Sequence, residues 1–194
     1  MTDYELTRRD ALKALGAAGV TVTGGAAALT WNGSENDDTD ESAEDDATSS
    51  EPDFGGHERE TYRAVATIVY PSEVAGIEEF VDSYVAGRVE ADSERAADMA
   101  AAVADLDAYT REWENSNFVA VDTATQEETL RGMGVNASDP DPHGDPRHRV
   151  RYYLVNDLLF ALYSSPTGGE LVGIENPQGY PGGTSSYQQP PNDQ

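Results

Sequence analysis

Between residues 57 and 163, apolar side chains recur at spacings of three and four residues, and no stretch alternates apolar with polar residues. This period places the apolar side chains on one face of a helix, whereas a half-buried strand would need strict alternation. Each such face must be buried against another element. The pattern predicts an all-α fold of about five helices in a small bundle, followed by a long irregular C-terminal tail rich in Gly, Pro and Tyr.

Four of the expected helices are amphipathic, and we place them at residues 57–70, 74–90, 92–114 and, starting at 122 or 125, up to 133. Pro71 ends the first, because proline disfavours helical geometry in the residue before it. Thr125 and Glu128 fit a capping box at the start of the fourth. Gly134 is expected to close that helix.

The fifth expected helix, residues 146–163, is the most apolar of the chain. One stripe consists of Val150, Tyr153, Leu154, Leu158, Ala161 and Leu162, and a second set covers much of the remaining surface: Tyr152, Val155, Leu159, Phe160 and Tyr163. A helix that is apolar nearly all round is either central in its own domain or covered by a partner. Tyr152 and Tyr163 are therefore either core residues or partner contacts. After residue 166, the Gly- and Pro-rich tail is expected to be extended and turned, not helical.

At the N-terminus, Arg8 and Arg9 precede Leu12 and Lys13, and a weakly apolar run over residues 14–29 follows. This pattern predicts a twin-arginine export signal, which is an address read by a receptor and not an anchor. The run is shorter than the about 20 apolar residues that span a membrane. Proteins sent by this route cross the membrane already folded. We therefore expect an exported protein that is extracytoplasmic, membrane-associated or at the cell surface, with cleavage of the signal left open.

Four segments follow from these patterns: a signal segment (1–31), an acidic linker (32–53), a helical domain (54–183) and a short tail (184–194). The linker and the short tail are expected to be disordered, because they offer too few apolar side chains to offset the entropy of ordering.

The charge of the chain is strongly negative, with 37 acidic residues against 12 basic ones and a formal net charge of −25. Adaptation to a high-salt medium accounts for this, because the Debye length is about 3 Å at 1 M salt and self-repulsion is then screened. An acidic face for a basic partner is the alternative. Nucleic acid is not an expected partner, because no basic patch is present to neutralise phosphates.

Several kinds of chemistry are excluded or unsupported. The chain has no Cys, so it forms no disulfide, thiolate iron–sulfur cluster or thioether-linked haem. We find no Gly-rich nucleotide loop in the body, no G-x-S-x-G motif and no catalytic residue that can be singled out. The loop at 139–145 faintly resembles a calcium loop, but Val150 occupies the twelfth position, where a bidentate acid belongs. Whether that loop binds a cation stays open.

Five segments together resemble a known family: T-I-V-Y-P-S (67–72), I-E-E-F-V-D-S-Y-V (77–85), N-F-V-A-V-D-T-A-T-Q-E-E-T-L (117–130), Y-Y-L-V-N-D-L-L-F-A-L-Y-S-S-P (152–166) and G-I-E-N-P-Q-G-Y-P-G-G (173–183). They resemble the gluconate 2-dehydrogenase subunit 3 family, the small subunit of membrane-associated, flavin-dependent sugar or alcohol dehydrogenases. The likeness covers about residues 57 to 183.

The resemblance implies a non-catalytic accessory subunit with no cofactor of its own. Its partner would be a large flavoprotein of the glucose-methanol-choline type, which holds FAD and the active site. The small subunit would help that partner to mature and, through the twin-arginine export machinery, to cross the membrane. The likeness also places Tyr180, Pro181, Gly182 and Gly183 at the subunit contact. The alternative is a free-standing secreted or surface helical domain that binds a ligand, and the dehydrogenase substrate and electron acceptor stay open.

Overall fold

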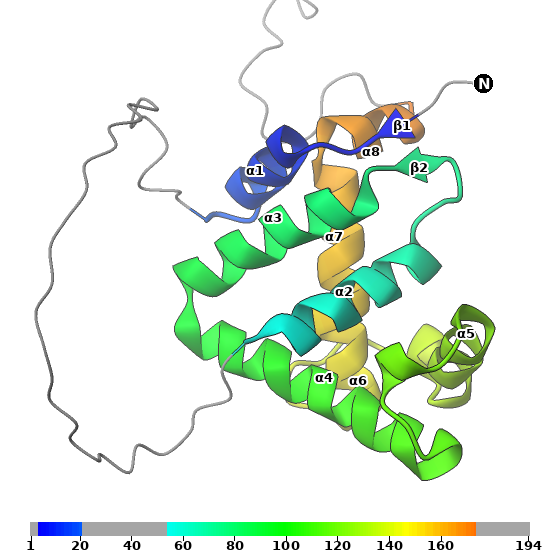
Figure 1. Ribbon diagram of the computed structural model, residues 1–194. Helices are drawn as coiled ribbons and strands as arrows, with labels where there is room; N and C mark the ends of the chain where they lie inside the picture. The colour runs from blue at the N-terminus through cyan, green and yellow to red at the C-terminus, as the bar shows by residue number, and fades with distance from the viewer. Residues whose placement is uncertain (1–3, 21–53, 174–194) are drawn as a thin grey trace, which may run out of the picture.

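The computed structural model describes residues 4–20 and 54–173, in which helices make up nearly all of the regular structure (Figure 1). The prediction of an all-α fold is confirmed for these residues. The expected linker and the chain beyond residue 173 lie outside the described residues. None of the described helices has the length and apolar character needed to cross a membrane.

The first three expected helices are present as α2 (Gly56–Val69), α3 (Ile77–Ala91) and α4 (Ser93–Glu114). Helix α2 ends where predicted, just before Pro71. Helix α3 begins later than predicted, because Val74–Ala75 forms the short strand β2 and Gly76 then turns the chain with a φ of 73°. A positive φ interrupts a right-handed helix and favours glycine, so the expected start at residue 74 is wrong.

Helix α5 (Thr123–Gly132) follows the 3-10 turn η1 (Phe118–Ala120). Its N-cap is Asp122, whose Oδ1 accepts from the backbone N–H groups of Ala124 at 3.0 Å and Thr125 at 3.1 Å. Of the two predicted starts, residue 122 is therefore confirmed. The capping box at Thr125 is wrong, because Asp122 already satisfies the free donors of the first turn. Gly134 ends this region as predicted, with a φ of 80°, and leads into the turn η2 (Val135–Ala137).

The fifth expected helix is a continuous helical rod made of α6 (Pro146–Val150), the π-helical segment η3 (Arg151–Asn156) and α7 (Asp157–Ser164). In Figure 1 it runs through the molecule in yellow and orange, and α2 and α4 pack against it. π-Helical turns are rare and often lie at functional sites.

A further helix, α8 (Pro166–Leu171), follows the rod, so the expectation of a non-helical chain after residue 166 is wrong for these residues. The Ser165 hydroxyl caps it by accepting from the backbone N–H of Gly168 at 3.0 Å. A Cβ at Gly168 would lie 1.8 Å from the Leu162 carbonyl oxygen. Glycine therefore allows α8 to fold back closely onto α7, a role that its loop-like sequence does not reveal.

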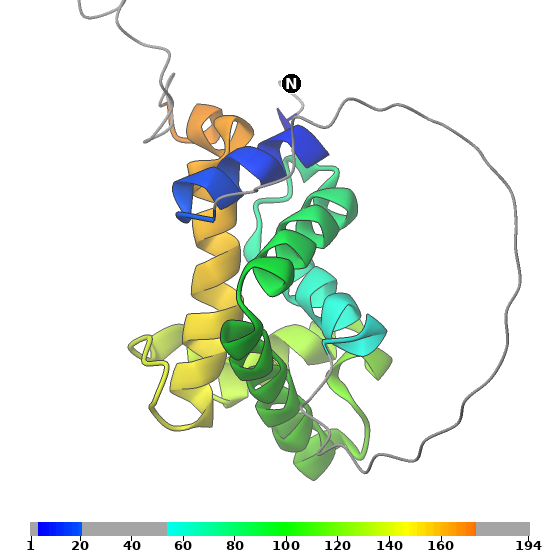
Figure 2. The same cartoon turned by 90° about the vertical axis from the view of Figure 1, so that its left-hand side faces the viewer.

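The N-terminal segment consists of β1 (Tyr4–Glu5) and α1 (Arg8–Ala17), and it packs on the helical body. Strand β1 pairs in parallel with β2, with Tyr4 opposite Val74. Helix α1 lies against α3 and also contacts α7 and α8 (Figure 2). The sequence pattern predicts a signal segment (1–31) separate from the helical domain, whereas Leu6, Ala11, Ala14 and Leu15 belong to the hydrophobic core of that domain in the structure.

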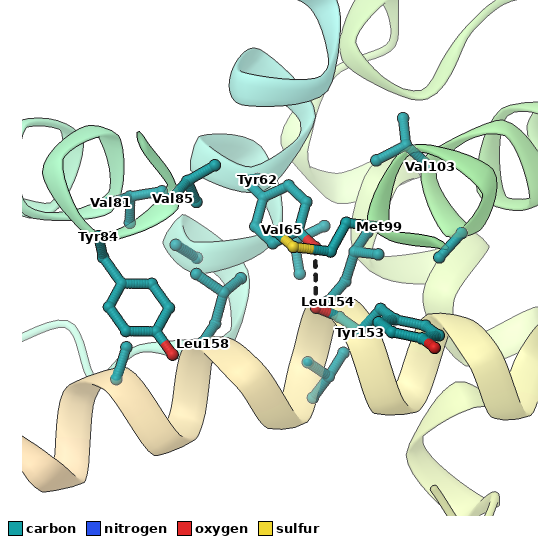
Figure 3. Close-up of a cluster of buried hydrophobic side chains, with 14 of the residues drawn as sticks. Tyr62, Val65, Val81, Tyr84, Val85, Met99, Val103, Tyr153, Leu154 and Leu158 are labelled. Carbon is teal, nitrogen blue, oxygen red and sulfur yellow. Dashed lines mark hydrogen bonds between the residues drawn. The ribbon is translucent and has the colours of Figure 1, made fainter. Parts of the chain in front are cut away.

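The core lies where α2, α3 and α4 meet the rod (Figure 3), and its members include Tyr62, Val65, Val81, Tyr84, Val85, Met99, Val103, Leu154 and Leu158. Two buried tyrosine hydroxyls tie α2 and its C-cap to this rod. Tyr62 donates to the Tyr153 carbonyl, and Tyr70 donates to the Leu158 carbonyl, each at 2.8 Å. Burial raises the pKa of both tyrosines, so the neutral hydroxyl that donates is the stable form.

Candidate partner-binding face

The two sides of the α6–η3–α7 rod differ in what covers them. The stripe predicted to face inward is buried, with Val150, Leu154, Leu158, Ala161 and Leu162 all fully covered. On the other side, Phe160 is 44% exposed and Tyr163 is 43% exposed. Both alternatives for this apolar helix therefore hold in part, because it is central in its own domain and still shows large aromatic side chains to solvent.

The structure separates the tyrosines that the sequence grouped together. Tyr163 lies on the surface of α7, as a partner contact requires. Tyr152 is half-buried, and its ring packs edge-on against Tyr153 with the ring centroids 4.8 Å apart. Tyr153 is buried and donates from its hydroxyl to Asp98 at 2.8 Å. Tyr153 is thus a core residue, and Tyr152 stands at the border between core and surface.

A hollow of about 380 Å³ lies next to these aromatic residues, between the end of α1, α3, α4 and the rod. It is lined by Ala17, Ala18, Arg88, Arg95, Pro140, Tyr152, Asn156, Asp157 and Phe160. Apolar pockets with a few convergent polar groups are the usual form of a binding site. We call the surface formed by this hollow, Phe160 and Tyr163 the rod face.

The floor of the hollow is a charged cluster that sequence reasoning missed. Asp157 Oδ1 accepts from the guanidinium groups of Arg88 at 2.7 Å and Arg95 at 2.9 Å, and from the Tyr84 hydroxyl at 3.3 Å. The Arg95 guanidinium also stacks over Tyr152, 5.8 Å from the ring centroid. Burial, with a further contribution from the Asp157 charge, raises the pKa of Tyr84.

This cluster joins three helices, because its arginines come from α3 and α4 and its carboxylate opens α7. Asp157 is only 5% exposed, and its Oδ2 has no hydrogen-bond partner among the described residues. A buried carboxylate is stable only when it is paired. An acid inside an otherwise apolar helix was the sequence signal for such a cluster, but nothing in the sequence indicated which arginines would reach it.

The four residues of the predicted export signal lie on α1. The side chains of Arg8, Arg9 and Leu12 are exposed, and Lys13 is half-buried. Arg8 Nε lies 2.5 Å from Glu79 Oε1 on α3. Of the predicted partner contacts, Tyr152 lines the hollow together with the end of α1, and Tyr163 is exposed on α7. The other four, Tyr180, Pro181, Gly182 and Gly183, lie outside the described residues.

Two other clusters of polar residues have structural roles. His57 Nε2 lies 2.6 Å from Asp107 Oδ2, and Asp107 Oδ1 accepts from the Phe118 backbone at 2.9 Å, which ties α2 and α4 to the turn η1. In the loop at 139–145, Asp141 accepts from the His143 backbone at 2.9 Å. Among the described residues no group of three or more His, Cys, Asp and Glu side chains is arranged to hold a metal ion.

Comparison with known proteins adds one finding. The family described as gluconate 2-dehydrogenase subunit 3 matches residues 56–182, well over half of the chain. The matched region begins with α2 and includes the whole rod, with Phe160 and Tyr163, but not α1, whose last turn lines one side of the hollow. No curated protein and no solved structure matches the chain.

Proposed function

The chain belongs to the gluconate 2-dehydrogenase subunit 3 family, and from this premise we propose that it is the non-catalytic small subunit of an exported, flavin-dependent sugar or alcohol dehydrogenase. The family description names a subunit of a dehydrogenase, so a catalytic partner chain is part of the family's setting. In the proposal, that partner is a large flavoprotein of the glucose-methanol-choline type. It holds FAD and the active site, and this chain binds it.

The observation that carries the proposal is the rod face, most of whose residues lie inside the matched region. Phe160 and Tyr163 are large side chains kept on the surface of a helix whose other side fills the core. Aromatic residues and arginines are enriched at the centres of protein interfaces, where they contribute most of the binding free energy. The rod face combines both kinds of residue around one hollow, which favours protein binding over solvation as its role.

Binding would also stabilise the partner during maturation. A subunit that binds only the folded form of its partner shifts the folding equilibrium toward that form by mass action. The twin-arginine signal on this chain would then address the assembled pair to the export machinery, which accepts folded cargo. The complex would be extracytoplasmic and associated with the membrane or the cell surface, either through the signal segment or through other subunits.

The experiment is affinity purification of a C-terminally tagged copy of the chain from a salt-adapted host that also makes the flavoprotein. The proposal expects a second, larger chain and the visible absorbance of bound flavin in the eluate. A colourless single chain, with the flavoprotein exported normally from cells that lack this chain, would contradict it. That result would favour a free-standing secreted or surface helical domain.

A further inference from the structure

We propose that the export signal has a docked state, in which residues 4–17 occupy a groove on the chain's own folded body and must leave it before the export receptor can read the full signal. The inference rests on the proposed function for the identity of this segment as an export signal. The docking itself stands on the contacts of the described residues.

The docked segment buries one complete face. Leu6 is 2% exposed, and Ala11, Ala14 and Leu15 are fully buried among core residues of the body. Leu6 also donates from its backbone N–H to the Ala75 carbonyl at 2.9 Å, which extends the pairing of β1 with β2. Burying two leucines and two alanines contributes to the free energy of folding, which a loosely attached leader would not do.

The body is shaped to receive this segment, because two of its glycines lie directly beneath it. A Cβ at Gly87 of α3 would lie 2.4 Å from Leu15 Cδ1. A Cβ at Gly76 would lie 2.2 Å from the Leu6 carbonyl oxygen. Real Cβ atoms essentially never come this close to another heavy atom. At Gly76 the atoms met are backbone, so the close approach of the segment depends on glycine there. At Gly87 they belong to the Leu15 side chain, which could shift to make room for a methyl group but not for a large side chain.

The segment depends on the body for its helical form. Helix α1 spans Arg8–Ala17, and an isolated helix this short is marginal in water. Its own sequence adds one capping box, in which Asp10 accepts from the Thr7 backbone N–H at 3.0 Å. Docking and helix formation are therefore coupled, and the alternative to the docked helix is a largely unfolded segment.

Docking divides the signal into a readable and a hidden part. The side chain of Arg8 is 75% exposed, and Arg9 is exposed as well. Ala14 and Leu15, which begin the apolar run of the signal, are inside the core. A receptor could touch the arginines of the docked segment, but it could not enclose the apolar run without displacing α1.

One protease site measures the docking directly. Lys13 is the only lysine in the chain, so a lysine-specific endoprotease has a single cleavage site, in the middle of α1. Cleavage requires local opening of the helix, and its rate follows the population of the open state when opening is fast. The substrate is the full chain with an intact N-terminus, purified in high salt.

Two substitutions on the body fill part of the groove, and so destabilise the docked state, while leaving residues 1–31 unchanged: Gly87→Leu and Gly76→Ala. Each forces atoms into a fitted contact, and we expect Lys13 to be cut at least about tenfold faster than in the wild type. The matched control is Ala101→Leu, which also enlarges a small residue, at an exposed position of α4. It should leave the rate unchanged, and circular dichroism must show that each variant is folded. Equal rates in wild type and both folded variants would overturn the docking.

Export in cells then tests the consequence. We expect Gly87→Leu to raise the initial rate of export, measured by pulse labelling, and Ala101→Leu to leave it unchanged. The double substitution Arg8→Lys, Arg9→Lys should lower it. If export depends on the arginines but Gly87→Leu does not raise its rate, the proposal that docking delays export is overturned, and the proposed function stands. If the double substitution has no effect, the export part of the proposed function fails, and the proposal that docking delays export fails with it.

Discussion

The two sides of the α6–η3–α7 rod come from the same stretch of sequence and both carry large apolar side chains, but the structure uses them differently. The inner side, with Leu154 and Leu158, is fully covered by the chain's own helices. The outer side exposes Tyr163 and also Phe160, which lines a hollow whose floor is the Asp157 cluster. The inner side explains why the chain folds, whereas Phe160 and Tyr163 on the outer side remain partly exposed to solvent.

The comparison teaches that hydrophobicity alone does not distinguish a core residue from a binding residue. Single exposed apolar residues are common on protein surfaces. Two large aromatic side chains, Tyr152 and Phe160, that line one hollow together with two arginines are a more specific feature. If the two sides do have separate roles, substitutions on the inner side should change stability, and substitutions on the outer side should change binding.

The largest effect on stability is expected at the junction of the two sides. Asp157→Asn removes the charge that pairs with Arg88 and Arg95, and breaking a buried ion pair costs about 3–5 kcal/mol. Denaturant unfolding followed by circular dichroism measures the change. The control is Glu127→Gln, which removes an exposed pair with Arg131 and should cost less than about 1 kcal/mol. A loss at Asp157 no larger than in the control would show that the cluster does not hold the three helices together.

The next largest effect on stability is expected on the inner side of the rod, and a substitution on the outer side of the same helix gives the comparison. Leu158→Ala leaves a cavity in the core and should lower the free energy of unfolding by about 2–5 kcal/mol. Phe160→Ala, two positions away on the outer side, should change it by no more than about 0.5 kcal/mol. Thermal and denaturant unfolding of the two variants give the comparison. Similar losses in both would mean that the outer side also belongs to the core.

A smaller effect on stability is expected when a buried tyrosine hydroxyl is removed. Tyr62→Phe removes the hydrogen bond to the Tyr153 carbonyl and should cost about 1 kcal/mol at neutral pH. Unfolding measured across pH adds a second readout. Burial raises the folded-state pKa of Tyr62, so its contribution is complete below an unfolded pKa of about 10 and is lost as the pH rises toward the folded pKa.

Between about pH 10 and 12, the wild type should therefore lose stability as the pH rises, because the unfolded chain releases tyrosine protons that the folded chain keeps. Tyr62→Phe should reduce this slope by up to about 1.4 kcal/mol per pH unit, the value for one proton. An unchanged slope would contradict the account of Tyr62 as a neutral, buried donor.

Much of the fold could be predicted because the helices from α2 to the rod carry a clear three- and four-residue period. The errors lie where one polar group or one glycine decides the outcome. Asp122, one of the two predicted starts, is the N-cap of α5, so Thr125 forms no capping box. Gly76 moves the start of α3 to residue 77. In the sequence, Gly168 looks like a loop residue, but in the structure it lies in α8 at the point where that helix packs closely against α7. Local periodicity does not report such contacts, because they depend on which element lies opposite.

The candidate site was predictable only in part. The apolar outer side of the rod marked Tyr163 as a candidate, and the structure leaves that side chain exposed. The Asp157 cluster could not be predicted, because its arginines lie on α3 and α4, far from Asp157 in sequence. The docking of α1 was equally hidden, since its few buried residues also fit the pattern of an export signal.

The most direct test of the separate roles is co-purification of the flavoprotein with a double variant, Phe160→Ser and Tyr163→Ser. We expect this variant to fold as stably as the wild type but to retain much less flavoprotein. Removing two central aromatic contacts typically weakens binding by more than about 30-fold. The readout is the ratio of bound flavin to tagged chain, with Glu127→Gln as a surface control. An unchanged ratio in the folded double variant would contradict the claim that the outer side of the rod is the partner interface.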